Sequence, residues 1–236
     1  MLIMGVESTA VSAGAAIVKD GKLIADAYLN LGLTHSETLM TLIDSCLKNA
    51  GLTIGDMNAL AVAHGPGSFT GVRIGVSVVK GLVFGKDIPV YGISTLEALA
   101  YGATVEGFLI CPAMDARCSQ IYTAAFIYES GRLNRVLEDS AMKLEAFYDY
   151  VLKQNKKVLL LGDGAALTAQ YLAGNGDAAF TVFPEIFRFQ HASGVAFAAW
   201  MRYSNGEAGI CGKDLLPGYL RLPQAERERM KGEKKE

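Results

Sequence analysis

The stretch 63–75, Ala-His-Gly-Pro-Gly-Ser-Phe-Thr-Gly-Val-Arg-Ile-Gly, constrains the fold of this chain more than any other. The short apolar run 59–63 before it predicts a buried strand, and the longer apolar run 72–84 after it predicts a helix. The glycines between them permit positive φ angles and bring backbone N–H groups close to whatever lies above the turn. The pattern fits either an anion-binding loop or a tight turn whose glycines serve only packing. It is not a Walker loop, because the Gly-x-x-x-x-Gly-Lys-Ser/Thr spacing is absent.

The same reasoning divides the rest of the chain into alternating strands and helices. Further strands are expected at 2–6, 14–18, 23–31, 89–94, 108–113, 120–128, 132–138, 157–161 and 180–183. Further helices are expected at 36–49, 95–103, 144–154, 165–172 and 192–203. The pattern restarts near residue 106. We therefore expect an N-terminal subdomain over 1–105, a C-terminal subdomain over 106–224 and a charged, flexible tail over 225–236.

Motifs spread along the chain resemble the signatures of one protein family. They are Gly65 to Gly75, His35-Ser36-Glu37-Thr38-Leu39, Met114-Asp115-Ala116-Arg117 with Ile121-Tyr122, Gly162-Asp163-Gly164-Ala165 and Tyr219-Leu220-Arg221. Taken together, they resemble the TsaB (YeaZ) family, which belongs to the tRNA threonylcarbamoyladenosine machinery. The similarity extends from residue 3 to about residue 226. The first motif is the most specific, and the later ones are informative because they fall in the expected order.

The resemblance implies an α/β fold made of two similar mixed-sheet subdomains of the actin-like ATPase, or ribonuclease H-like, type. In that fold the first turn approaches nucleotide phosphate, and an acidic side chain there holds magnesium or water. Transferred to this chain, the candidate nucleotide-binding residues are Glu7, Ser8, Thr9, Gly65, Gly67, Ser68, Gly162 and Gly164. Both kinds of turn also have a simpler interpretation, since an acidic turn can merely close a hairpin and a glycine turn can merely pack.

The chain lacks the residues of a complete active site. In TsaD, the catalytic relative that the resemblance brings in, the helix equivalent to 95–103 carries two metal-binding histidines, whereas this segment has none. The three histidines of the chain, His35, His64 and His191, do not have the i, i+4 spacing. No Asp or Glu lies between 61 and 75 to hold magnesium for a kinase. We therefore expect no catalytic residue, no metal and no required cofactor, with ATP bound only weakly or in a complex.

The helix expected over 72–84 is apolar around most of its circumference. Its polar residues Arg73, Ser77 and Lys80 form one narrow stripe, so a second surface must cover it in addition to the sheet. Either a partner protein or this chain's own second subdomain could supply that surface. If it is a partner, the expected interface residues are Leu39, Ile43, Gly71, Gly75, Val76, Val79 and Val83. The glycines among them would permit close approach of another helix.

Composition limits how such a chain could act. With a net charge of −2 and a pI of about 6.0, it has no basic field that attracts nucleic acid. The resemblance implies a non-catalytic dimerisation or scaffold subunit that pairs with TsaD and supports binding of the ATPase TsaE. TsaC or a relative of it would supply the intermediate. The complex would transfer threonylcarbamoyl to the adenosine next to the tRNA anticodon, and the isolated chain would form a homodimer.

Two other classes remain open. One is a stand-alone nucleotide-binding enzyme of the actin-like fold, such as a kinase or ATPase, and the other is a peptidase, a label that relatives in this family have carried. Tight ATP binding with turnover by the isolated chain would favour the first, while the missing histidine pair argues against metal-dependent peptide cleavage. The N-terminus lacks the basic region of a signal peptide, and the run 72–84 is too short to span a membrane. We therefore expect a cytoplasmic protein without membrane contact.

Overall fold

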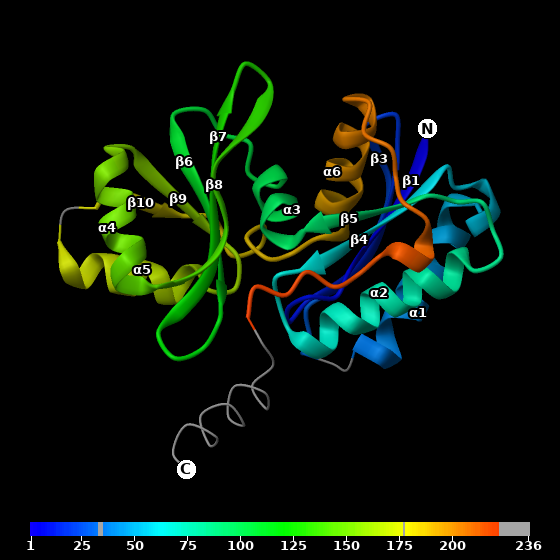
Figure 1. Ribbon diagram of the computed structural model, residues 1–236, viewed down its shortest axis with the longest axis horizontal. Coiled ribbons are helices and arrows are strands. Elements are labelled where there is room, and N and C mark those ends of the chain that lie inside the picture. Colours follow the sequence, from blue (N-terminus) through cyan, green and yellow to red (C-terminus); the bar gives the residue numbers. More distant parts are fainter. Residues whose placement is uncertain (33–34, 177, 222–236) are drawn as a thin grey trace, which may run out of the picture.

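The computed structural model describes residues 1–32, 35–176 and 178–221, which form two lobes side by side (Figure 1). The first lobe is built on a five-stranded sheet of order β3-β2-β1-β4-β5. Its strands are β1 (Leu2–Glu7), β2 (Ala13–Lys19), β3 (Lys22–Leu29), β4 (Ala59–Gly65) and β5 (Val90–Ser94). The first three strands form an antiparallel meander, and β4 and β5 continue the sheet in parallel with β1.

The second lobe repeats this arrangement with a second five-stranded sheet, of order β10-β9-β6-β7-β8. Its strands are β6 (Phe108–Asp115), β7 (Gln120–Glu129), β8 (Arg132–Lys143), β9 (Lys157–Leu161) and β10 (Phe180–Val182). Here β6, β7 and β8 form the antiparallel meander, and β9 and β10 are parallel to β6. The strand order is therefore the same in both lobes, which confirms the expected α/β fold of two similar mixed-sheet units.

Helices fill the connections of both repeats. They are α1 (His35–Ala50), α2 (Phe69–Val83), α3 (Thr95–Tyr101), α4 (Leu144–Gln154), α5 (Ala165–Asn175) and α6 (Ala192–Ser204), with short 3-10 helices η1 (Ile54–Asp56) and η2 (Gly212–Asp214). α2 begins three residues earlier than expected, because the Ser68 hydroxyl caps it by accepting a hydrogen bond from the Gly71 N–H. Within the described ranges, no helix is both long enough and apolar enough to cross a bilayer.

The last helix of each repeat packs against the sheet of the other lobe. α6 lies on β1, β2 and β4 of the first sheet, while α3 contacts β6, β7 and β8 of the second. Leu96 of α3 belongs to the same buried cluster as Phe126 of β7. Val195 of α6 belongs to the same buried cluster as Ile3 of β1. The two crossing helices also contact each other, so they form the junction of the lobes (Figure 1).

This crossing corrects the expected division of the chain. The described residues of the expected second subdomain, 106–176 and 178–221, do not form one compact unit, because α6 and the segment 208–221 that follows it lie on the first lobe. That segment is attached to the edge of the first sheet through backbone hydrogen bonds between Val90 and Ile210. The expected tail, 225–236, lies outside the described residues.

The apolar side chains expected at a partner interface are instead part of the first lobe's core. They are Leu39, Ile43, Val76, Val79 and Val83, and each is at most 5% exposed. That expectation is wrong because two parts of the same chain cover α2. The first sheet and α1 cover one side, and segment 208–221 covers another, where the Lys80 ammonium donates to the carbonyls of Lys213 and Leu215.

Candidate functional site

A pocket of about 450 Å³ opens between the lobes. It lies where the carboxyl ends of β1 and β4 meet those of β6 and β9, the edge at which open α/β sheets bind their ligands. Its walls are Thr9–Val11, Pro66–Phe69, Met114–Arg117, Tyr122, Asp163 and Gly218–Arg221. Three residues expected from the sequence, Thr9, Gly67 and Ser68, are therefore at the pocket surface.

The glycine-rich loop between β4 and α2 packs directly on the turn that follows β1. A Cβ on Gly67 would lie 2.4 Å from the Thr9 carbonyl oxygen, and a Cβ on Gly71 would lie 2.0 Å from that of Ser8. The Ser68 N–H donates to the Thr9 carbonyl at 2.6 Å, and the Ser8 hydroxyl donates to the Gly71 carbonyl at 2.9 Å. These glycines are thus needed for contact between two backbones of the same chain.

Two further glycines follow the same principle. A Cβ on Gly75 would lie 2.5 Å from the Ser8 hydroxyl oxygen, so this glycine approaches the β1 turn and not a partner helix. A Cβ on Gly65, whose φ is +125°, would lie 2.3 Å from the Gly218 carbonyl oxygen. Gly65 therefore lies beneath segment 208–221, and the expected role of Gly71 and Gly75 in a helix interface is corrected.

Glu7 closes the β1 turn from inside. Its side chain is completely buried, and its Oε1 accepts hydrogen bonds from both the N–H and the hydroxyl of Thr9 at 2.6 Å. Its Oε2 has no hydrogen-bond partner among the described residues. Burial raises the pKa of Glu7 to about 7, against the smaller opposing effect of the bonds from Thr9. Near neutral pH this carboxyl group therefore exchanges between a protonated and a charged form.

In the second lobe, the turn after β9 is equivalent to the glycine-rich loop after β4 and lies on the other side of the pocket. Gly162, with φ of +97°, and Gly164 approach the backbone of β6, and the Gly164 N–H donates to the Ala113 carbonyl at 2.9 Å. Asp163, between these glycines, lines the pocket and accepts a hydrogen bond from the Gln190 amide at 2.9 Å. Burial is the main cause that raises the pKa of Asp163. The glycine pair thus holds an acidic side chain opposite the first lobe.

Segment 208–221 forms the remaining wall and bridges the lobes. The Tyr219 ring stacks on Phe69 with centroids 4.5 Å apart, and the Arg73 guanidinium lies 3.9 Å from the Phe69 centroid while donating to the Tyr219 hydroxyl. Arg221 reaches across and donates to the Ala116 carbonyl at 2.7 Å. From the sequence, Tyr219 and Arg221 were noted only as part of a family motif, and no role in a pocket wall was expected for them.

The pocket presents side chains suited to binding a small polar molecule. Asp115 and Asp163 supply acceptors, while Arg117 and Arg221 supply donors. Ser8 and Gly65 lie below the surface, and Gly162 and Gly164 flank Asp163 without lining the pocket themselves. Among the described residues, no three His, Cys, Asp or Glu side chains come together as metal ligands usually do.

Two repeated α/β lobes with a pocket at the carboxyl ends of their inner strands define a protein of the actin-like fold class. A family model described as TsaD, tRNA N6-adenosine threonylcarbamoyltransferase, matches residues 32–226. The tRNA threonylcarbamoyladenosine biosynthesis protein TsaB of Bacillus subtilis (strain 168) is 31% identical over 99% of this chain and 100% of its own length. This chain therefore belongs to the TsaB family, within the wider family that the TsaD model describes.

A longer protein and a solved structure are also similar to this chain. The tRNA N6-adenosine threonylcarbamoyltransferase of Nitratidesulfovibrio vulgaris (strain DP4) is 32% identical over 65% of this chain, which covers only 47% of that longer protein. A crystal structure from Pseudomonas aeruginosa, described as an uncharacterized protein with similarity to peptidase YEAZ, has a TM-score of 0.79 at 22% identity. It covers 93% of this chain and 99% of its own, and it agrees with the two-lobed fold.

Proposed function

We propose that this chain is a non-catalytic subunit in tRNA threonylcarbamoyladenosine biosynthesis and that it pairs with a TsaD-type protein. One observation carries the proposal: the glycine-rich loop and the acidic turn close on each other, backbone against backbone. A nucleotide-hydrolysing site needs those same groups to face the ligand. The full-length similarity to TsaB, whose name places it in that biosynthesis, supports the pathway.

The solvent-facing side of α2 is the surface that best fits such a partner. Phe84, just after the helix, is 86% exposed, although it is a large aromatic residue. Ile74, Val78 and Leu82 form a half-buried row leading to it at four-residue intervals. Gly81 has nothing within 4 Å of the position of a Cβ, so another helix could approach closely there. This row replaces the buried valines as the proposed interface.

The test is a pairing measurement with a charged substitution. In Phe84→Asp we expect the dissociation constant for a TsaD-type partner to rise at least tenfold, because an interface would desolvate the new carboxylate. Phe187→Asp is the matched control, since Phe187 is 60% exposed but lies between β10 and α6, beside Ala98 and Leu99 of α3 and not on α2. Equal affinity of both variants and the unchanged chain would overturn the α2 interface. Loss of pairing in both variants would point to another surface.

The remaining partners follow from the same assembly. We propose that TsaE and TsaC-type proteins and tRNA act with the assembled pair, and that two copies of this chain pair through the α2 row when no TsaD-type protein is present. Sedimentation of the isolated protein tests the last point. The unchanged chain should sediment as a dimer and Phe84→Asp as a monomer.

The pocket between the lobes supports a second candidate function, that of an ATP-dependent enzyme that acts alone. Its carboxyl-end position and the unpartnered Oε2 of Glu7 are the observations in its favour. We propose that ATP binds this chain only weakly or in the complex, and that no transition metal accompanies it. Calorimetry with Mg-ATP and elemental analysis test both statements. Hydrolysis of several ATP per minute that Glu7→Gln abolishes would favour the enzyme.

A further inference from the structure

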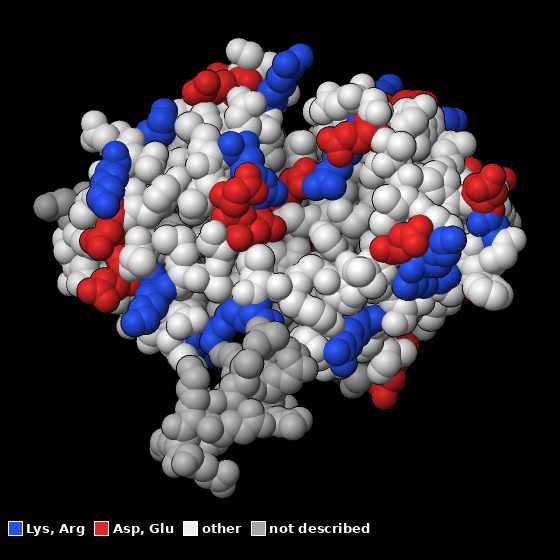
Figure 2. All heavy atoms as spheres, viewed as in Figure 1, with Lys and Arg blue, Asp and Glu red and all other residues white. Residues whose placement is uncertain are grey.

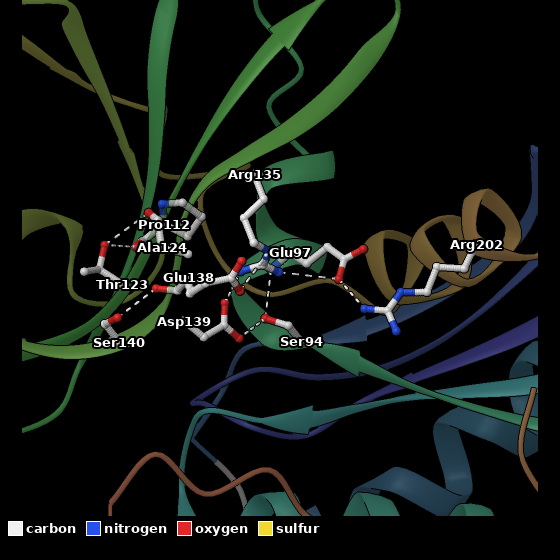
Figure 3. A network of polar contacts seen from close by, with 10 residues as sticks. All are labelled: Ser94, Glu97, Pro112, Thr123, Ala124, Arg135, Glu138, Asp139, Ser140 and Arg202. Carbon is white, nitrogen blue, oxygen red and sulfur yellow. Dashed lines mark hydrogen bonds and ion pairs between the residues drawn. The ribbon is translucent and has the colours of Figure 1, made fainter. Parts of the chain in front are cut away.

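A network of charged side chains lies at the junction of the lobes (Figure 3). Arg202 comes from α6, Glu97 from α3, and Arg135 and Asp139 from β8, while Ser94 is the last residue of β5. On the molecular surface, side chains of both charges gather along the boundary between the lobes (Figure 2). The network therefore joins three layers of the molecule: α6 on the first sheet, the crossing helix α3, and β8 of the second sheet.

The contacts run continuously across these layers. Glu97 Oε2 accepts from Arg202 Nη2 at 2.6 Å and lies 3.6 Å from Arg135 Nη2. Arg135 also pairs with Asp139, and Asp139 accepts a hydrogen bond from the Ser94 hydroxyl. Two of these contacts, Glu97 with Arg135 and Ser94 with Asp139, connect the end of β5 and the start of α3 to β8.

The surroundings make these contacts stronger than ordinary surface pairs. The side chains of Glu97, Arg135 and Asp139 are 13%, 22% and 20% exposed, so water screens them only partly. The Arg135 guanidinium also lies 4.6 Å from the centroid of the Phe126 ring. Removing the Glu97 carboxylate would take from Arg202, whose side chain is 31% exposed, the carboxylate that it pairs with.

The same junction controls the relative position of the pocket walls. Thr9 and Ser68 belong to one lobe, whereas Asp115 and Asp163 belong to the other, so a rotation of the lobes would change the pocket width. Two-lobed proteins commonly close around ligands through such hinge or shear movements. The crossing helices α3 and α6 are where that movement would take place.

We propose that the network of Ser94, Glu97, Arg135, Asp139 and Arg202 locks the two lobes in one relative orientation and so fixes the width of the pocket between them. Glu97 is the central member, because its carboxylate faces an arginine from each side. This proposal is independent of pairing with a TsaD-type protein. It concerns a property of the single chain.

The chain carries its own labelling sites for a test. Cys118 in the second lobe and Cys211 in segment 208–221 are exposed, whereas Cys46 and Cys111 are buried. With nitroxide labels on the two exposed cysteines, pulsed electron paramagnetic resonance measures the distance between the lobes. In Glu97→Ala we expect the distance distribution to become at least twice as wide as in the unchanged protein. Glu97→Gln keeps a hydrogen-bond acceptor for Arg202 and should give an intermediate width.

Glu138→Ala is the matched control. Glu138 also contacts Arg135, at 3.9 Å, but both lie on β8 and the Glu138 side chain is 88% exposed. We expect its distribution to match that of the unchanged protein. An unchanged distribution in folded Glu97→Ala would overturn the proposal, because apolar packing of α3 would then suffice to hold the lobes. If Glu97→Ala fails to fold, Glu97→Gln decides by the same criterion.

A double-substitution cycle separates the lock from general loosening. If Glu97 and Arg135 act through their mutual contact, Glu97→Ala and Arg135→Ala together should widen the distribution no more than the larger single effect. Additive widening would mean that each residue acts separately, and it would contradict the proposed lock.

Discussion

The two acidic turns of this protein occupy equivalent positions in the two repeats but differ in their surroundings. Glu7, the last residue of β1, accepts a hydrogen bond from the N–H two residues later, at 2.6 Å, and Asp115, the last residue of β6, does the same at 2.7 Å. Glu7 is completely buried, whereas Asp115 is exposed at the pocket. The local turn is thus similar in both lobes. What covers the turn decides whether its acid can meet a ligand.

The glycine turns of the repeats show the same contrast. The loop after β4 and the turn after β9 both use glycines to approach the backbone of the neighbouring strand's end. Between the paired glycines, the first lobe has Pro66 where the second has Asp163. Only the second lobe therefore adds a carboxylate to the pocket at this point. Each of the four predictions below tests one part of this contrast.

The largest effect is expected from Gly71→Ala. Its Cβ would lie 2.0 Å from the Ser8 carbonyl oxygen, and neither backbone can move without shifting a strand or a helix. We expect a loss of more than about 3 kcal/mol of unfolding free energy, or failure to fold. Gly81→Ala on the same helix is the control, because its Cβ meets nothing within 4 Å. That variant should gain up to about 1 kcal/mol in urea unfolding.

The second prediction concerns pH. In the folded protein, burial raises the pKa of Glu7 to about 7, above the ordinary value of 4.5. The stability that this proton contributes is fully present below pH 4.5 and is lost as pH rises through 7. Between pH 4 and pH 8, the unfolding free energy of Glu7→Gln should therefore rise by about 3 kcal/mol relative to that of the unchanged protein.

Asp115→Asn is the matched substitution in the second lobe, where the side chain is exposed. It should change stability by less than about 1 kcal/mol at either pH. Denaturant unfolding of both variants across the pH range measures the contrast. A pH-independent effect of Glu7→Gln would show that Glu7 does not titrate in this window.

A smaller effect is expected where segment 208–221 covers the first lobe's loop. Tyr219→Ala removes the stack on Phe69 and the hydrogen bond from Arg73. Because Tyr219 is 41% exposed, we expect a loss of about 1 kcal/mol in thermal or urea unfolding. Tyr219→Phe retains the ring and should keep more than half of that stability. Equal losses in both variants would assign the effect to the hydrogen bond alone.

The smallest effect is expected in the loop after Asp115. Arg117, Cys118 and Ser119 all have positive φ, between 55° and 65°, which is unfavourable for residues with a Cβ. Ser119→Gly relieves that cost but increases the freedom of the unfolded chain, so a gain of a few tenths of a kcal/mol is expected. Ser130→Gly, at φ of 53° in another turn, should behave alike. A clear loss of stability in Ser119→Gly would show that the side chain makes a necessary contact.

The sequence predicted the elements of this fold well where the signal was local. Short, mainly apolar runs between polar or glycine residues, as at 59–63 and 157–161, predicted strands β4 and β9 at nearly the observed positions. The residues of α2 were recognised as too apolar for one sheet. What covers Val79 was not recognisable, because segment 208–221 is more than a hundred residues away and its contact with α2 depends on the whole chain's path.

The candidate site divides along the same line. The family resemblance was enough to single out Glu7, the Gly65–Gly71 loop and the Gly162–Gly164 turn, whereas residue type and spacing alone left a turn-closing or packing role open. Only the tertiary structure decided that Glu7 is buried and that Asp163 faces the pocket. The physical reason is that glycine permits close approach to any neighbour, whether backbone or ligand. The packing of the two lobes decides which group lies against each glycine.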